Sequence, residues 1–549
     1  MAKLLFNRWV GLVFISMGIS LVIIDGTIVN TIFPTVIKAL NLTSTQVQWV
    51  QESYVLVFAS LLLIWGSLAD RYGRRLMMII GVLLFIAASV WAGTSTSADS
   101  MILARVVQGI GGSMVLPTTL SLVNANFAGR ERGIAFAVWG STIGGMVALG
   151  PVIGGWLAST YTDGWRLAFN VNLPIGILIV IGVLLSVPES KVASKHDGLD
   201  VVGALISIVM FLTLVFGLIE GRTYGWLTVN KQFELGSFKW ASSGISVIPV
   251  ALGISVLSAV LFVLWERGRA KRQKNVILDL DLFHIASFRN GSIAALIISM
   301  GEFGVIFALP LWLQNVQGLS AVDSGLVLLW LAGGAFLASG AAGSMSGKVS
   351  PATAVRVGVL LELVGVSAVA LAIGNDAGWG WVAPGLLLYG IGVGFATAQL
   401  TGVIMIDVNQ DKAGQASGTQ STARQVGSAL GIAVIGTTLF TATSSIMTDK
   451  LNALNLPSQF FNDAQKKAIV DAVVDSSGGA IPVLKQQLIE KSHGMLPANT
   501  AAQIADAAGH SFSQGAMWAA YCAVGFLVVG FLSTFKLSSK QHSEGSHAE

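Results

Sequence analysis

The chain has 549 residues, of which 54% are hydrophobic and only 11% are charged. Its mean hydropathy of +0.74 lies outside the range of soluble domains, so we expect a bilayer to solvate most of it. The net charge of +4 comes from basic residues scattered over short loops without interleaved aromatic residues, which argues against nucleic-acid binding. A single cysteine, Cys522, excludes an intramolecular disulfide and a cysteine-rich metal or redox site.

Apolar runs long enough to cross about 30 Å of hydrocarbon recur from end to end. The first run is too long for a signal peptide and is not followed by a small-residue cleavage site, so we expect it to be retained as a helix. The runs predict fourteen membrane helices, near residues 10–33, 46–68, 76–96, 100–122, 134–158, 167–187, 200–220, 243–265, 291–312, 324–345, 354–374, 382–405, 414–444 and 514–535.

Loop charge predicts the orientation of these helices. Lys and Arg gather in alternate short loops, and short cytoplasmic loops are enriched in these residues, so we expect both termini to be cytoplasmic. The polar stretch 445–513 then lies on the outer side, where segments 463–475 and 482–492 have helical spacing. We interpret it as a cap on the outer mouth, with a gate or a docking site for an envelope partner as the alternative.

A weak repeat suggests two related halves. GSLADRYGRR from Gly66 and GSMSGKVSPA from Gly343 occupy equivalent loops if two helices are inserted between two six-helix bundles. Such halves are typical of transporters that alternate access to a central site. The predicted division is an N-terminal bundle over 1–190, two inserted helices with a cytoplasmic linker over 191–275, and a C-terminal bundle over 276–549.

Two motifs have a physical interpretation on their own. The first motif comprises Gly66, Asp70, Arg71, Gly73, Arg74 and Arg75. Its glycines permit a tight turn, and its charges permit ion pairs that bridge helix ends in one conformation and break in another. The alternative is that its arginines only set the topology. The second permits close helix packing, with a kink at its proline; it comprises Gly144, Gly150, Pro151, Gly154 and Gly155.

Charged residues within the predicted spans are candidates for function, because burying one costs at least ~2.5–3.5 kcal/mol. Asp25 lies in the outer half of the first span, and Glu52 at the outer start of the second can face it. Two such acids in a cleft suit proton exchange near neutral pH. The alternatives are an Asp25 hydrogen-bonded to its own helix, as to Thr27 or Asn30, and a Glu52 at the water interface.

Further charges lie deeper in the chain. Glu302, near the middle of its span, is predicted to bind a proton or substrate. Arg105 is expected to hold a carboxylate ionised or to respond when it protonates, and Arg424 has a packing or a functional role. Glu362 is interpreted as structural, paired with Arg356 or Lys348. The predicted substrate cavity is lined by Asp25, Tyr54, Glu302, Phe303, Trp312 and Arg424.

Several motifs resemble those of the major facilitator superfamily, specifically its fourteen-helix drug:proton antiporter group. They are DGTIVNTIFP from Asp25, GSLADRYGRRLM from Gly66, RVVQGIGGS from Arg105, GGMVALGPVIGG from Gly144, WRLAFNVNLPIG from Trp165 and LPLWLQNVQGLSAVDSGL from Leu309. The resemblance implies an all-α major facilitator fold in the plasma (inner) membrane and proton-coupled export of amphipathic or cationic compounds, that is, multidrug efflux. It associates the Arg105 motif with proton transfer and the Gly144 motif with antiport.

Other functions remain open from the residues alone. Export of an endogenous lipid, peptide or metabolite with an envelope partner is one alternative, and a ligand sensor on a transporter scaffold is another. A membrane-bound transferase is disfavoured because the chain has no phosphate-binding loop, no nucleophile elbow and no metal-ligand spacing among its histidines. We therefore expect no enzyme activity, cofactor or metal, and a small molecule, protons and the lipid bilayer as partners.

Overall fold

The computed structural model describes residues 7–42, 44–191, 199–235, 238–345, 349–374, 378–454, 456, 461–492 and 496–537. This part of the chain is built from helices, with one short hairpin, β1 (Glu234–Leu235) and β2 (Phe238–Lys239). Its first helices are α2 (Arg8–Leu40), α3 (Ser44–Tyr72), α4 (Arg74–Thr94), α5 (Ala98–Asn126), α6 (Gly129–Thr160), α7 (Gly164–Asn170), α8 (Asn172–Ser186), α9 (Val201–Tyr224) and α10 (Val247–Lys271). The remaining α-helices are α11 (Ala286–Asn315), α12 (Ala321–Met345), α13 (Pro351–Gly374), α14 (Val382–Met405), α15 (Ala413–Ala453), α16 (Asp463–Asp475), α17 (Ile481–Lys491) and α18 (Ala498–Thr534), with short 3-10 helices at Leu280–His284, Trp379–Trp381 and Gln410–Lys412.

Each predicted apolar run falls on helix. Hydrocarbon offers no hydrogen-bond partners, so a helix, which satisfies its own backbone, is the form such runs adopt in a bilayer. Among the described residues, twelve helical segments are long and apolar enough to cross a membrane; α6 and α12 are further long helices in the same body. The sixth predicted run is divided between α7 and α8, which meet at Val171.

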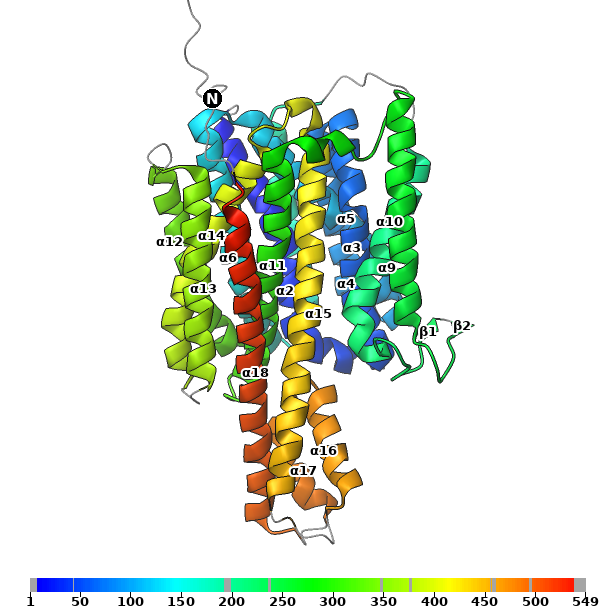
Figure 1. The fold of residues 1–549 in the computed structure, drawn as a ribbon, viewed down its shortest axis with the longest axis vertical. Coiled ribbons are helices and arrows are strands. Elements are labelled where there is room, and N and C mark those ends of the chain that lie inside the picture. Colours follow the sequence, from blue (N-terminus) through cyan, green and yellow to red (C-terminus); the bar gives the residue numbers. More distant parts are fainter. Residues whose placement is uncertain are drawn as a thin grey trace, which may run out of the picture.

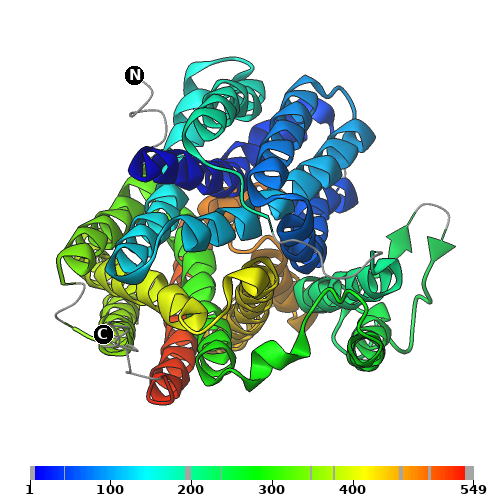
Figure 2. The same cartoon turned by 90° about the horizontal axis from the view of Figure 1, so that it is seen from above.

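Helices α2 to α8 pack mainly against one another, as do α11 to α15 with α18 (Figures 1 and 2). Contacts between the two groups run through α6 with α12 and α14, and through α15 with α3 and α5. Helices α9 and α10 pair with each other at the periphery, where α9 also contacts α3 and α15. Helix α2 begins and helix α18 ends at the same end of the molecule, which we call the terminal end.

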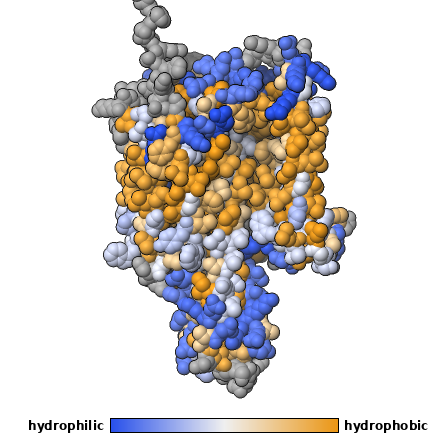
Figure 3. All heavy atoms as spheres, viewed as in Figure 1, coloured by the Kyte–Doolittle hydropathy of each residue, from blue (hydrophilic) through white to orange (hydrophobic). Residues whose placement is uncertain are grey.

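A broad hydrophobic belt crosses the visible face of the main body, with hydrophilic side chains above and below it (Figure 3). The peripheral pair α9 and α10 contributes strongly exposed apolar side chains, including Leu205, Val256 and Leu264. Exposure of this kind in water would be unfavourable, and in a bilayer it is the expected surface of a helix that faces lipid.

Beyond the belt, α15 and α18 continue into a polar extension opposite the terminal end (Figure 1). With 41 and 37 residues, at 1.5 Å per residue, they are about 61 and 55 Å long, so each reaches well past about 30 Å of hydrocarbon. Helices α16 and α17 pack on them around Val473, Leu484 and Phe512. The two short helices expected within 445–513 are therefore confirmed, but this segment is a small helical bundle rather than a loop.

The backbones of the two groups of helices approach each other closely where α3 crosses α15 at Gly66. A Cβ on Gly66 would overlap the carbonyl oxygen of Gly414 and would lie 2.9 Å from Cα of Gly418. Both obstacles are backbone atoms, which cannot move aside as a flexible side chain can. Close approach of α3 and α15 therefore requires glycine at this position.

This packing predicts that Gly66→Ala lowers the free energy of unfolding by about 1–3 kcal/mol, the usual cost of overpacking. Thermal unfolding of the purified protein in detergent measures the change. Gly253→Ala on the lipid-facing α10 is the matched control, because a Cβ there meets no atom within 4 Å. Equal melting temperatures for the two variants would contradict the close α3–α15 crossing.

Candidate functional site

A buried polar network joins four of the N-terminal helices around Asp25. Arg105 Nη1 donates to Asp25 Oδ2 at 2.7 Å, while Gln108 Nε2 and Asn172 Nδ2 each donate to Asp25 Oδ1 at 2.8 Å. Ser89 Oγ accepts from the same two amides. The side chain of Asp25 is fully buried and that of Arg105 is 3% exposed. One negative and one positive charge thus compensate each other, with additional hydrogen bonds on the carboxylate.

Tyr54 on α3 completes this network. The guanidinium carbon of Arg105 lies 4.3 Å from the centroid of the Tyr54 ring, a cation–π contact in a water-poor site. The same guanidinium donates to Gln108 Oε1 at 2.5 Å. Arg105, which is expected to hold a carboxylate, therefore pairs with Asp25 and contacts Tyr54, and this arrangement places helices α2, α3 and α5 around one charge pair.

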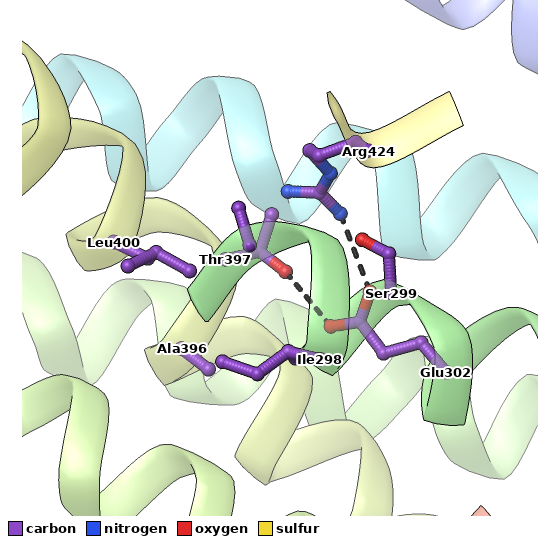
Figure 4. Close-up of a pocket in the computed structure, with 8 residues that line it drawn as sticks. Ile298, Ser299, Glu302, Ala396, Thr397, Leu400 and Arg424 are labelled. Atoms are coloured by element: carbon purple, nitrogen blue, oxygen red, sulfur yellow. Dashed lines mark hydrogen bonds and ion pairs between the residues drawn. The ribbon is translucent and has the colours of Figure 1, made fainter. Parts of the chain in front are cut away.

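A second buried ion pair lies among the C-terminal helices (Figure 4). Arg424 Nη2 on α15 lies 3.3 Å from Glu302 Oε2 on α11, and Thr397 Oγ1 on α14 donates to Glu302 Oε1 at 3.4 Å. Tyr389 donates its hydroxyl to the Glu302 backbone carbonyl at 3.1 Å. The two contacts to the Glu302 carboxylate are longer than those to Asp25, so this carboxylate is held less firmly.

A narrow pocket opens onto this second pair. Its lining is Ala295, Ile298, Ser299, Glu302, Ala396, Thr397, Leu400 and Arg424, from α11, α14 and α15. The lining side chains leave no room for even a water-sized sphere between them, whereas pockets for drug-sized ligands hold roughly 300–1,000 Å³. In this conformation the pocket has an apolar wall and one charge pair, but too little room for a large ligand.

The motif at Gly66 joins the two groups of helices at the terminal end. Asp70 pairs with Arg74, whose Nη2 lies 2.7 Å from Asp70 Oδ1. The Asp70 carboxylate also accepts from the backbone amides of Gly414 and Gln415, at 2.9 and 3.1 Å, in the first turn of α15. An anion is stabilised there by the free N–H groups and the helix dipole. Arg74 donates in turn to the Gln410 carbonyl at 2.7 Å.

The same motif also starts α4. Glu189 accepts from the backbone amides of Arg75 and Leu76 at 3.0 Å, and Arg75 Nη1 donates to the Val187 carbonyl at 3.1 Å. Gly73 has a φ of 122°, and a Cβ there would come within 2.7 Å of the Glu189 carboxyl carbon. The guanidinium carbon of Arg71 lies 5.7 Å from the centroid of the Tyr72 ring.

The glycine-rich motif lies on α6, where it faces two neighbours. A Cβ on Gly150 would overlap Thr27 of α2, and one on Gly155 would overlap Val322 of α12. Gly154 packs on α2 in the same way. Gly144 and Pro151 lie in the continuous α6, but their immediate surroundings are outside the described part of the structure.

Several predicted site residues lie elsewhere. Glu52 does not face Asp25 but lies beside Glu220 of α9, because the peripheral pair packs against this part of α3. Trp312 is fully buried and donates to Ser513 of α18 at 3.0 Å, so it is a packing residue here. Phe303 is half-buried next to Glu302 and does not line the pocket.

The interpretation of Glu362 needs correction as well. Neither of its carboxylate oxygens has a hydrogen-bond partner among the described residues, and Arg356 instead lies over the ring of Phe535 at 5.0 Å. Lys348, the other expected partner, lies outside the described residues, as does part of the repeat that begins at Gly343. Glu362 lies on α13, whose neighbour is α14, so the pairing expected along its own helix is not formed.

Sequence reasoning missed the amides that bind Asp25. Gln108 and Asn172 both lie within the motifs quoted for the resemblance, at RVVQGIGGS and WRLAFNVNLPIG, and an uncharged polar residue in an apolar span was the available signal. Thr397 carried no such signal, because threonine is frequent in these helices. Among the described residues, no group of three or more metal-ligating side chains is close enough to hold a metal ion.

Comparison with known proteins gives consistent matches. The family model described as Major Facilitator Superfamily matches residues 15–432. The probable actinorhodin transporter of Streptomyces coelicolor is 32% identical over 444 residues, covering 79% of this chain and 73% of that protein. The multidrug efflux pump LfrA of Mycolicibacterium smegmatis is 30% identical over 512 residues, covering 93% and 92%.

Solved structures share the fold at low sequence identity. The human organic anion transporter MFSD10 has a TM-score of 0.57 at 12% identity, covering 96% of this chain and 99% of that one. The proton:xylose symporter XylE has a TM-score of 0.55 at 14% identity, covering 86% and 94%. These likenesses concern the arrangement of helices alone.

The Asp25 network predicts that Asp25→Asn lowers the free energy of unfolding by about 3–5 kcal/mol, because the variant leaves Arg105 buried without a counter-charge. Denaturant unfolding in detergent measures the loss. Glu131→Gln is the matched control: it removes one partner of an exposed pair with Arg8, whose side chains are 40% and 50% exposed, and should change stability by under about 1 kcal/mol. Similar effects of the two substitutions would argue against a stabilising role of the network.

Proposed function

This chain belongs to the major facilitator superfamily and is a multi-pass membrane transporter rather than an enzyme, and we propose that it exports small amphipathic or cationic compounds in exchange for protons. The names of its relatives, a multidrug efflux pump and an actinorhodin transporter, support export. The observation that carries the proposal is the Glu302–Arg424 pair, a loosely bonded carboxylate at the edge of an apolar pocket. Such a carboxylate can bind either a cation or a proton.

The proposed architecture has fourteen membrane helices with both termini in the cytoplasm. Helices α6 and α12, with 32 and 25 residues, are long enough to add to the twelve apolar spans of the described residues. The basic residues near the terminal end, among them Arg71, Arg74 and Arg75, support a cytoplasmic position for that end. We keep the division into 1–190, 191–275 and 276–549, with α9 and α10 as the insertion.

The proposed mechanism is alternating access by movement of the two bundles. In this conformation the terminal end is closed, because Asp70 of α3 binds the first turn of α15. Helices α5 and α15 meet across the two groups and carry buried polar atoms that have no hydrogen-bond partner among the described residues. These atoms are both side-chain amide atoms of Asn124 on α5 and Oε1 of Gln420 on α15. Unsatisfied groups of this kind are unfavourable when dry, and water that enters on opening would satisfy them.

Coupling in this proposal is mutual exclusion of proton and substrate at buried acids. Glu302, with contacts of 3.3 and 3.4 Å, is the acid at the pocket. Asp25, with contacts of 2.7 and 2.8 Å, takes part when its network with Arg105 opens during the cycle. Glu52, beside Glu220, is a further proposed acid on the path of the proton.

The test of this function is uptake of ethidium, a fluorescent monovalent cation, into everted membrane vesicles that carry an imposed pH gradient. Wild type should accumulate ethidium only with the gradient present. Glu302→Gln, which keeps the side-chain shape but removes the charge, should reduce the initial rate at least about tenfold, equivalent to 1.4 kcal/mol of lost interaction. Glu131→Gln on the surface is the control for expression and should retain the wild-type rate.

Three results would oppose the proposal. Gradient-independent binding without accumulation would favour the ligand sensor. Export of an endogenous compound but not of any cationic probe would favour the more specialised exporter. An unchanged ethidium rate in Glu302→Gln would remove Glu302 from the coupling site.

The closing contact at the terminal end predicts a conformational effect of Asp70→Asn. The substitution removes the charge from the first turn of α15 and from Arg74, so the terminal ends of α3 and α15 should separate in a larger fraction of molecules. Electron–electron distance measurements between spin labels at Tyr72 and Asp411, in a background with Cys522 replaced, detect this as a second, longer distance. Asp163→Asn, an exposed acid near α7, is the control. A distance distribution identical to wild type would contradict the latch.

A further inference from the structure

Glu362 of α13 is a buried acid for which the structure provides no conventional partner. Glu362 is 0% exposed, and neither of its carboxylate oxygens has a hydrogen-bond partner among the described residues. Its side chain lies against α14 at Gly392, where a Cβ would come within 2.7 Å of Glu362 Cγ. An ionised carboxylate in this position would be buried without a single donor, which costs several kcal/mol, whereas a protonated carboxyl avoids most of that cost.

The groups that act on Glu362 come from three other helices, of which α14 packs directly on α13. Glu302 of α11 and Arg424 of α15 interact with it electrostatically, and Tyr389 of α14 is the further titratable group next to the two acids. Arg356 on its own helix is engaged with Phe535. The cluster therefore contains two carboxyl groups against one guanidinium.

Charge balance then decides how many protons this cluster holds. With Glu302 ionised, Arg424 charged and Glu362 neutral, the sum is zero; with both acids ionised it would be −1 in a low-dielectric site. The Asp25 network differs, since one carboxylate there faces one guanidinium and is neutral without a proton. Of these two ion-pair sites, the C-terminal one is thus the site that requires a stored proton.

We propose that Glu362 stores the exchanged proton of the C-terminal site and releases it when a cation binds beside Glu302. The exchange is balanced: the cation adds one positive charge to the pocket, the O–H bond of Glu362 breaks, its proton leaves to water and the carboxylate remains, so the cluster stays neutral. One proton leaves per monovalent cation. This inference rests on the proposed proton-coupled export and names the second acid that such export uses.

Proton release on binding tests the inference directly. Purified protein in weakly buffered detergent solution is titrated with tetraphenylphosphonium, a monovalent lipophilic cation, while a pH indicator reports released protons. Wild type should release about one proton per bound cation, and its apparent Kd should fall up to about tenfold per pH unit while Glu362 is protonated. Glu362→Gln, fixed in the neutral form, should bind weakly, with a Kd independent of pH and without proton release.

A second measurement does not depend on the substrate. Infrared difference spectra between high and low pH should contain the C=O stretch of a protonated carboxyl in wild type and in the surface control Glu131→Gln. The band should be absent in Glu362→Gln, and in Glu302→Gln it should appear only at lower pH than in wild type, because Arg424 then faces Glu362 as its single counter-charge. Because Glu362 makes no hydrogen bond that the substitution removes, Glu362→Gln should also retain the wild-type melting temperature, which separates this role from a structural one.

The two hypotheses fail in distinguishable ways. If wild type transports cations with the proton gradient but Glu362→Gln still releases one proton per bound cation and keeps the carboxyl band, the assignment of Glu362 is wrong and the proposed function stands. If wild type shows neither gradient-driven uptake nor proton release with ethidium and tetraphenylphosphonium, the proposed function is wrong and the inference falls with it.

Discussion

Hydrocarbon cannot stabilise a bare charge, and the described structure pairs its deepest charges with partners on other helices. Asp25 meets Arg105, and Glu302 meets Arg424, in each case from a different helix. Removing one partner would leave an uncompensated buried charge, which is strongly unfavourable, so each pair constrains which helices lie side by side. The same requirement makes the pairs sensitive to any added proton or cation, which is the property that the proposed mechanism uses.

The two pairs differ in a way that suits different tasks. The Asp25 carboxylate receives three short hydrogen bonds and is saturated, and its guanidinium partner lies on an aromatic ring, with only Nε of Arg105 lacking a hydrogen-bond partner among the described residues. The Glu302 carboxylate has two long contacts, borders a pocket and has a second acid beside it. A saturated network holds helices in place, whereas an undersatisfied one changes its protonation or ligand at lower cost.

Helix α15 connects these features along one continuous rod. Its first turn binds Asp70 of α3, and Arg424 follows about three turns later. Further along, the Phe440 ring centroid lies 3.8 Å from the guanidinium carbon of Arg222 on the peripheral α9. Beyond the belt the same helix forms part of the polar extension. Asn315 of α11 also contacts this extension, because its side-chain amide donates a hydrogen bond to the Ser477 carbonyl. A rigid rotation of α15 therefore moves the latch, the ion pair and the extension together.

Sequence alone determined the helical architecture, since runs of apolar residues in a bilayer have few structural options, and it identified Asp25, Arg105, Glu302 and Arg424 because charges in such runs are rare. It also located the Asp70 motif. Which charges meet was decided by tertiary structure: Glu52 pairs with an acid of α9 instead of Asp25, and Glu362 joins Glu302 and Arg424 rather than Arg356. Periodicity along one helix shows that a side chain is buried, but its partner lies on a helix far away in the chain, and the packing of glycine-lined crossings fixes which helix that is.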